Sequence, residues 1–408
     1  MGNELNQEAR DLVVGLDAGG TRTRAVLAAA EDGRPLGEGA AGPGNALTVP
    51  VPQLTEHLAE AVGQAVPEPD RGRVVAVAGG FAGATDAFAD EPGRRNALAA
   101  LTAALRGLGI DAGPPVVRSD IEAAFASAPG TPADGLALVA GTGAVAMRIT
   151  DRRASATVDG DGWLLGDDGS GFWIGRAAVR AALRMADGRG APTSLAEAVG
   201  RELGVPGDVL PGGASGGVAG GAVRRLSPGV VQGRAERTSG DVRHAAVPPL
   251  TGPAALDHAR GQPAGPAHTG AAGPPAGDRR PLPPHEAPWS RHHREAYRGH
   301  LLPAVMAEPP VRLARLAPLV AAAARHAEDP VALAILDEAA DHLTETVRAL
   351  DPGPGERLVA TGGLLGPDGP LTTRLEARLH TLGLTLDWVP DGRRGAVALA
   401  RLALGGRT

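Results

Sequence analysis

The sequence predicts an α/β protein built from two domains of similar design. A chain of 408 residues is long enough for two domains. An apolar strand, a turn of Gly and Thr, and a second apolar strand occur twice, at 13–27 and 136–149. Further strand and helix patterns follow each of these hairpins, which is typical of α/β domains.

The composition limits the chemistry that the chain can perform. It contains no cysteine, which excludes disulfides, thiolate zinc sites, iron–sulfur clusters and cysteine nucleophiles. All 40 basic residues are arginine. The absence of lysine excludes a Walker A loop, a protein-kinase active site and Schiff-base chemistry. Only 2% of the residues are aromatic, so Ala, Leu and Val must form the core.

Charge and hydropathy indicate the class of partner. The net charge of −6 does not suggest nucleic-acid binding. We find no apolar run of 18 residues, and the first ten residues are polar. We therefore expect a cytoplasmic protein without a signal peptide or membrane span.

The first predicted domain, residues 1–115, opens with the first hairpin. Asp17 stands at the end of its first strand and can hold Mg²⁺ directly or through water. Backbone N–H groups and hydroxyls at such a turn can cradle a phosphate. The candidates are Gly19, Gly20, Thr21 and Thr23. The alternative is an ordinary hairpin with a solvated turn.

The remainder of this domain alternates loops, helices and a strand. Residues 33–44 are rich in turn formers, and Asn45 follows them. Its amide suits a sugar hydroxyl or an acetamido group, although ordinary turn chemistry is the favoured interpretation. The spacing then predicts a helix at 54–66, a buried strand at 73–78 and a helix at 94–108.

The second predicted domain comprises residues 116–205 and 300–408. Its first strand ends at Asp120, which opens a helix over 121–127. The second hairpin turns at Gly141, Thr142 and Gly143, and the two hairpins could grip one phosphate chain from opposite sides. Later patterns predict helices at 174–185, 194–203, 310–326, 330–350, 371–382 and 395–404, and strands at 357–360 and 384–389.

A loop over 159–176 combines carboxylates with flat apolar side chains, as a sugar site requires. It contains Gly162, Trp163 and Asp168. The same loop can serve as the lead-in of a helix, with Ser170 near its N-cap. We expect both roles.

Residues 206–299 change in character. Pro, Gly, Arg and His dominate, and such a segment cannot bury enough apolar surface to offset its ordering entropy. It is interpreted either as a disordered insertion or as an out-of-frame product. His292 and His293 lie here, but metal binding is not the favoured interpretation.

Five segments together resemble the sugar kinase/heat-shock-70/actin ATPase superfamily, and more narrowly its N-acetylglucosamine kinase branch of BadF/BadG/BcrA/BcrD-type ATPases. They are Asp17–Thr21, Gly44–Asn45, Ser119–Asp120, Gly141–Gly143 and Gly162–Gly175. A later Thr361–Gly362–Gly363 is similar to the adenosine element of that family. The resemblance implies two ribonuclease-H-like domains flanking a nucleotide cleft.

The resemblance also implies site roles. Asp120 would be the general base, and ATP with Mg²⁺ would be held by Asp17 and by both hairpins. Gly362 and Gly363 would approach the adenosine. The expected sugar contacts are Asn45, Asp120, Gly162, Trp163 and Asp168.

The expected activity is ATP-dependent phosphorylation of a sugar hydroxyl, on an amino sugar such as N-acetylglucosamine or glucosamine. The alternative is a non-catalytic sugar or nucleotide sensor, or an inactive relative disrupted at 206–299. The family's dehydratase activators hold an iron–sulfur cluster by cysteines, which this chain lacks. A homodimer is the default assembly. Ser119 stands where the family usually has Asn, Ala144 where it has Ser, and Asp168 where it has Glu.

Overall fold

The computed structural model describes residues 11–85, 91–211 and 289–405, and these form two five-stranded mixed sheets. The first sheet has the order β3-β2-β1-β4-β5. Its strands are β1 (Leu12–Ala18), β2 (Thr23–Ala29), β3 (Pro35–Ala41), β4 (Val74–Phe81) and β5 (Val116–Ser119). β1 pairs antiparallel with β2 and parallel with β4, so the predicted first hairpin is confirmed.

The second sheet repeats this topology in the order β8-β7-β6-β9-β10. Its strands are β6 (Gly135–Ala140), β7 (Ala144–Thr150), β8 (Arg153–Asp159), β9 (Arg357–Thr361) and β10 (Thr385–Trp388). β6 and β7 form the second hairpin, and β9 is parallel to β6, as β4 is to β1. The α/β prediction with a repeated design is therefore confirmed.

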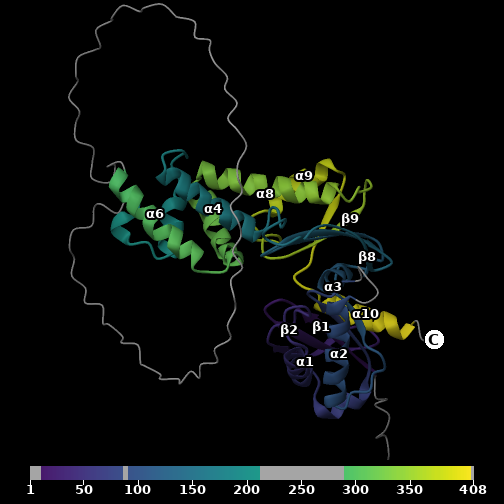
Figure 1. Cartoon of the computed structure of the whole chain (residues 1–408). Coiled ribbons are helices and arrows are strands. Elements are labelled where there is room, and N and C mark those ends of the chain that lie inside the picture. Colours follow the sequence, from purple (N-terminus) through teal and green to yellow (C-terminus); the bar gives the residue numbers. More distant parts are fainter. Residues whose placement is uncertain (1–10, 86–90, 212–288, 406–408) are drawn as a thin grey trace, which may run out of the picture. The chain divides into compact units, whose positions relative to one another are not determined.

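Helices cover both faces of the first sheet (Figure 1). α1 (Val51–Ala65) and α2 (Pro92–Gly107) pack their leucines and alanines on one face. α10 (Arg393–Gly405) packs on the other face, beside α3 (Asp120–Ala126). A short η1 helix (Glu68–Arg73) precedes β4. Small side chains allow these layers to pack closely despite the scarcity of aromatic residues.

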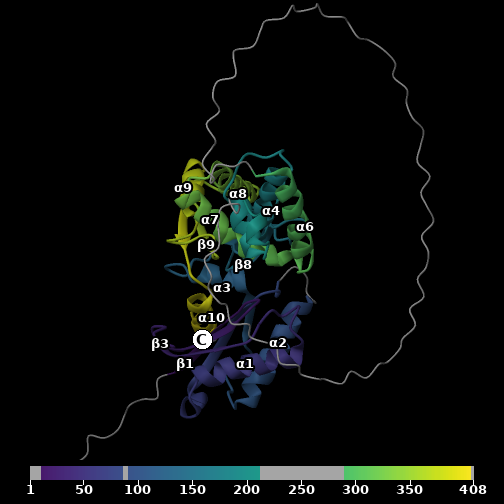
Figure 2. The same ribbon diagram turned by 90° about the vertical axis from the view of Figure 1, so that its left-hand side faces the viewer.

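The second sheet carries its helices on one face (Figure 2). These helices are α4 (Gly171–Ala186), α5 (Leu195–Glu202), α6 (Arg291–Met306), α7 (Ala317–His326), α8 (Pro330–Arg348) and α9 (Thr372–Thr381), with short η2 (Gly207–Val209) and η4 (Pro310–Leu316) turns. The other face packs against α3 through Ala124 and Phe125. Because Ala126 belongs to the core beside the first sheet, α3 contacts both sheets.

The first sheet extends beyond the domain boundary that was predicted after residue 115. β5 pairs in parallel with β4, so it belongs to the first sheet and not to the second. α10 also packs on the first sheet, although 300–408 was assigned to the second domain. The linear order of patterns could not show this, because a helix can return to a distant sheet without any local signal.

The predicted irregular segment was too wide at both ends. η2 precedes Leu210, which is buried, and α6 begins at Arg291. Tyr297 of α6 is fully buried and its hydroxyl donates a hydrogen bond to the Ala196 carbonyl at 2.7 Å. The polar residues of α6 concealed its narrow apolar face. The rest of the segment, 212–288, lies outside the described residues.

Two strands were missed, and both lie at sheet edges. β3 was interpreted as a turn-rich loop, and β8 was not predicted. Both consist only of exposed and partly exposed residues, so neither carries the apolar run of a central strand. In the described residues, no helix is both long and apolar enough to cross a membrane.

Candidate active site

The start of α3 fixes the position of Asp120. Ser119 caps the helix: its Oγ accepts a hydrogen bond from the Glu122 N–H at 3.1 Å. The Glu122 carboxylate accepts from the Ser119 N–H at 2.9 Å, which completes a capping box. Serine therefore fulfils the capping role at the position where the family usually has Asn. Asp120 is the first residue of α3. It lies between Ser119 and Glu122, whose two hydrogen bonds fix this turn of the chain.

Asp120 lines two cavities. The first, of about 350 Å³, also contains Asp17, Gly362 and Gly363. The second, of about 520 Å³, is lined by other residues at the start of α3 and by residues of the strands β7 and β8. The structure thus brings together the predicted base, the predicted metal ligand and the predicted adenosine glycines. One carboxyl group borders both spaces.

The environment of Asp120 makes its carboxyl group weakly acidic. Burial raises its pKa, the nearby Asp17 carboxylate raises it further, and the backbone N–H of Ile121, at 3.0 Å from Oδ1, opposes both effects. The resulting pKa is about 6, compared with an ordinary value of 3.8. A carboxylate with a pKa near neutrality is a stronger proton acceptor than an exposed one.

Asp17 lies in a mixed field of charges. Its side chain is 13% exposed, and burial together with the neighbouring Asp391 raises its pKa. Arg24 opposes this from 3.5 Å, since the hairpin register places it directly across from Asp17. Within the described residues, no group of three or more metal-ligating side chains exists. Mg²⁺ requires only one or two carboxylates, so a partly buried Asp17 facing a cavity fits such an ion.

The first glycine turn is partly as predicted. The Gly19 N–H donates to the Arg22 carbonyl at 2.9 Å, while Gly20 and Thr21 are exposed at the tip. Thr23 is fully buried, and Gly44 packs directly over its Oγ1. The strand pleat turns the Thr23 side chain inward, so its hydroxyl lies inside the hairpin and not at the exposed turn.

The second turn lies at the start of α4. The N–H groups of Gly171 and Phe172 donate to the carbonyls of Gly141 and Thr142 at 2.8 and 3.1 Å. Thr142 is exposed. The Asp167 carboxylate accepts from the Ala144 N–H at 3.1 Å and adjoins Gly143. Residues of neither glycine turn line the two cavities around Asp120.

The later glycine pair closes the first cavity. Gly362 has φ +110°, and a Cβ there would stand 2.2 Å from the Ala140 carbonyl oxygen, so only glycine fits. Gly363 has open space on the side where a Cβ would point. A ligand can therefore approach the backbone closely at this turn, as the adenosine prediction requires.

The predicted sugar contacts are dispersed. Asn45 uses its amide oxygen to accept from the Leu47 and Thr48 N–H groups, as the turn interpretation expects. It adjoins Gly83, which lines the 520 Å³ cavity. Gly162, Trp163 and Asp168 do not line either cavity. Trp163 is 40% exposed and packs edge-on against Phe172.

Asp159 organises the loop that contains these residues and was not among the predicted site residues. Its carboxylate accepts from the Asp167 and Asp168 N–H groups at 2.6 and 2.9 Å. Asp159 and Gly160 line the 520 Å³ cavity. Ser170 caps α4 by accepting from the Trp173 N–H, which confirms the helix lead-in.

Other residues were missed as well. Arg24, Trp388, Asp391 and Gly392 line the 350 Å³ cavity. The position of Arg24 could have been found, because a two-strand register pairs it with Asp17. Asp391 had been interpreted only as the entry to the last helix. It accepts hydrogen bonds from the N–H and side chain of Arg393.

Comparison with solved structures places the fold. A candidate N-acetylglucosamine kinase of Porphyromonas gingivalis aligns with a TM-score of 0.57 and 17% identity, over 96% of this chain and 99% of that one. A candidate N-acetylglucosamine kinase of Chromobacterium violaceum aligns with a TM-score of 0.54 and 20% identity, over the same shares of the two chains. At such identities the likeness concerns the fold.

The sequence itself matches a family model. No curated protein matches the chain. The model of the BadF/BadG/BcrA/BcrD ATPase family matches residues 14–373, which include all but the first residues of the first hairpin, the whole second hairpin, Asp120 and the glycine pair. The resemblance suggested by the sequence is thereby confirmed, and the chain belongs to the BadF/BadG/BcrA/BcrD ATPase family.

Proposed function

We propose that this chain is an ATP-dependent sugar kinase that phosphorylates a hydroxyl of an amino sugar, such as N-acetylglucosamine or glucosamine. The observation that carries the proposal is the position of Asp120 between two cavities. A phosphoryl transfer needs a base that touches both the acceptor and the path to the phosphate. Membership of an ATPase family supports ATP as the phosphoryl donor.

In this mechanism the sugar occupies the 520 Å³ cavity. Asp120 accepts the proton of the attacking hydroxyl, and its raised pKa strengthens it as an acceptor. Gly362 and Gly363 let the adenosine approach the backbone. The exposed turn residues Gly20, Thr21 and Thr142 offer their N–H groups to phosphates. Mg²⁺, which Asp17 would hold through water, neutralises phosphate charge when bound.

The remaining predicted contacts complete the proposal. Asn45 adjoins the wall of the sugar cavity at Gly83. Gly162, Trp163 and Asp168 belong to a loop whose anchor, Asp159, lines that cavity. In this proposal the loop moves toward the bound sugar, as active-site loops commonly do, and brings these three residues into contact with it.

The direct test is an ADP-release assay. Purified protein is incubated with ATP, Mg²⁺ and each of a panel of amino sugars and neutral hexoses. ADP release that depends on one of the sugars supports the kinase. Nucleotide binding without turnover on any sugar would contradict it and favour a sensor.

The pH dependence of the reaction reports on the base. Because Asp120 must be ionised to accept a proton, kcat/KM for the sugar is expected to be constant well above pH 6. It should fall about tenfold per pH unit below the pKa of about 6. The assay uses saturating Mg²⁺ and ATP at every pH, so that titration of the nucleotide does not dominate. A profile that stays flat from pH 7 to pH 4.5 would exclude Asp120 as the base.

A further inference from the structure

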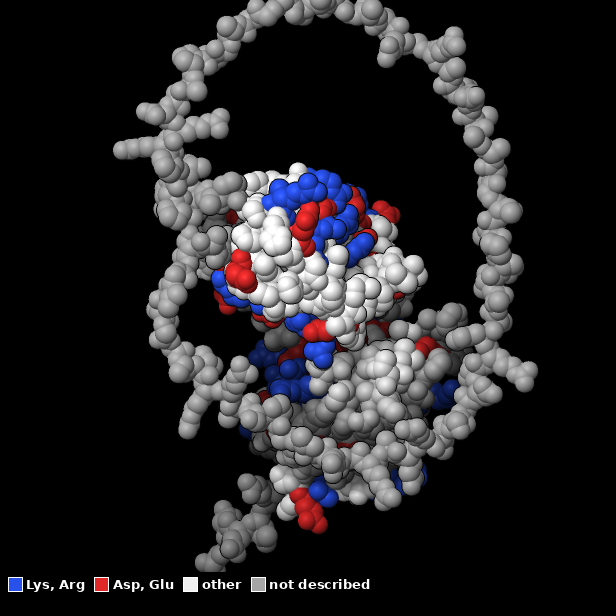
Figure 3. Space-filling model, turned by 60° about the vertical axis from the view of Figure 1, so that its left-hand side comes forward, with Lys and Arg blue, Asp and Glu red and all other residues white. Residues whose placement is uncertain are grey.

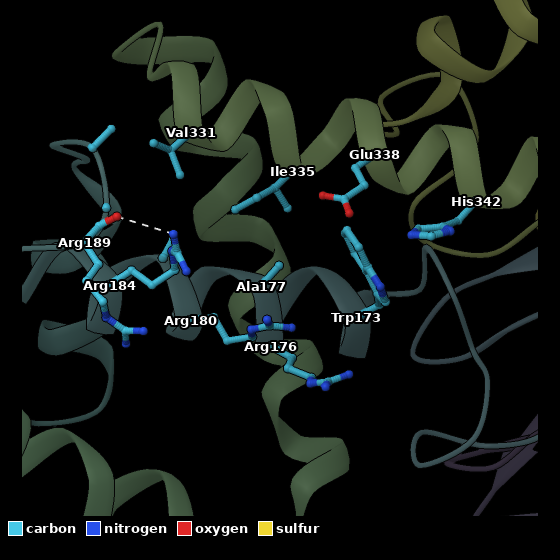
Figure 4. A pocket seen from close by; sticks show the side chains of 13 residues that line it. Trp173, Arg176, Ala177, Arg180, Arg184, Arg189, Val331, Ile335, Glu338 and His342 are labelled. Atoms are coloured by element: carbon cyan, nitrogen blue, oxygen red, sulfur yellow. Dashed lines mark hydrogen bonds between the residues drawn. The ribbon is translucent and has the colours of Figure 1, made fainter. Parts of the chain in front are cut away.

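A third cavity, of about 530 Å³, lies between α4 and α8, away from Asp120 and the glycine pair. Arginine side chains extend into it from α4, and Glu338 and His342 face it from α8 (Figure 4). Arginines also gather on one face of the part of the molecule that contains the second sheet (Figure 3). The roles proposed above leave this cavity unused.

The spacing of the arginines explains their alignment. Arg176, Arg180 and Arg184 follow one another at intervals of four residues, which places them on one face of α4. Arg189, in the loop after α4, extends the row. Within the described residues, Arg176 and Arg180 form no ion pair, whereas Arg189 pairs with Asp187. Two guanidinium groups are thus available to a ligand.

The acidic residues of α8 do not balance this charge. Asp337 and Asp341 pair with Arg374 and Arg378 of α9 at 3.0 and 2.6 Å. Only Glu338 contributes a carboxylate to the lining of this cavity, which is an open groove between α4 and α8. A helix face that was simply solvated would be expected to carry opposite charges at intervals of four residues. The row on α4 instead repeats one sign.

The groove also has an apolar floor and an aromatic end. Ala177, Ala181 and Ile335 line it between the arginine row of α4 and Glu338 of α8. At one end the rings of Trp173 and His342 meet edge to face, with centroids 5.0 Å apart. Apolar contact beside a few charged groups is the usual composition of a small-molecule site, and the volume lies in the usual range.

We propose that this groove binds a phosphomonoester of a small ring-containing molecule. The guanidinium forks of Arg176 and Arg180 match the geometry of phosphate oxygens, which they contact by paired, charge-assisted hydrogen bonds. The ring lies toward Trp173. A sugar phosphate and a nucleoside monophosphate share this chemistry. The proposal does not depend on the proposed kinase activity, because binding is measured without turnover.

The test is a tryptophan fluorescence titration. The full chain carries Trp388→Phe, which removes the tryptophan that lines the 350 Å³ cavity. The probes are a hexosamine 6-phosphate, AMP and inorganic phosphate. We expect a saturable change with at least one phosphomonoester, and affinity at least tenfold weaker in Arg180→Gln, as loss of a charged hydrogen bond implies. The organic probe that binds more tightly shows whether the site takes a sugar phosphate or a nucleoside monophosphate.

The matched control is Arg95→Gln, which removes an exposed arginine from α2, beside the first sheet. It should leave the affinity unchanged. Absence of a saturable change with every probe at concentrations on the order of 10 mM would overturn the proposal. Equal affinity in Arg180→Gln and Arg95→Gln would overturn it too, because the ligand would then bind elsewhere.

Discussion

Asp120→Asn is expected to reduce sugar-dependent ADP release by about 10²–10⁴-fold. The amide keeps the size of the side chain and can still accept the Ile121 N–H hydrogen bond. It cannot accept the proton of a hydroxyl at neutral pH. The measurement is kcat/KM for the sugar at pH 8, where the wild-type carboxyl group, with its pKa of about 6, is ionised.

The same substitution is expected to stabilise the fold above pH 6. The pKa of Asp120 rises from 3.8 to about 6 on folding, so its ionised form weakens the folded state once the pH exceeds both values. The shift corresponds to at most about 3 kcal/mol, and we expect about 1–2 kcal/mol because the side chain is only half-buried. Urea unfolding should show the gain at pH 8 and lose most of it near pH 4.

Asp208→Asn is the matched control, since Asp208 is exposed in η2. It should change neither kcat/KM nor the urea midpoint. A stabilised Asp120→Asn protein with full activity would contradict the role of the base while leaving its burial intact. A destabilised, inactive protein would instead show that Asp120 supports the fold.

Gly395→Ala is expected to destabilise the protein by about 3 kcal/mol or more. An added Cβ would lie 1.8 Å from the Ala123 carbonyl oxygen and 2.6 Å from the Ser127 nitrogen. The Gly395 N–H also donates to the Ser127 Oγ at 2.8 Å. Both helices must separate to accept the methyl group. Because α3 carries Asp120, the remaining folded protein should also lose activity.

Gly405→Ala provides the comparison within the same helix. Among the described residues beyond its own stretch of helix, no atom lies within 4 Å of the position that its Cβ would take. Alanine is the better helix former, so this variant should be neutral or slightly more stable. The urea midpoint at pH 8 distinguishes the two. Equal midpoints would mean that α10 and α3 can rearrange without cost.

The sequence predicted the fold best at the centres of the two sheets, where apolar runs are separated by glycine turns. The hairpins at 13–27 and 136–149 follow from apolar runs interrupted by glycine, and both form as predicted. The edge strands β3 and β8 were missed because they are largely exposed. α6 was missed because its buried Tyr297 stands among charged residues.

The candidate site was predictable where it depends on strand ends and less so where it depends on packing. Asp17, Asp120 and the glycine pair meet around one cavity. Thr23 was grouped with the exposed turn residues, yet its side chain is buried, since a turn of uncertain length hides which residue points inward. Asp391 could not be expected, because only the chain's return to the first sheet brings it near Asp17.

That return has a consequence for how the protein is made. Residues 393–405 supply Val397, Leu399 and Ala400 to the core on one face of the first sheet. A ribosome completes the strands of this sheet by residue 119 but starts α10 only at residue 393, at roughly 5–20 residues per second. During that interval only α3, which follows β5 directly, covers part of this apolar sheet face. Until α10 has been made, the nascent chain must therefore shield the rest of this face by other means.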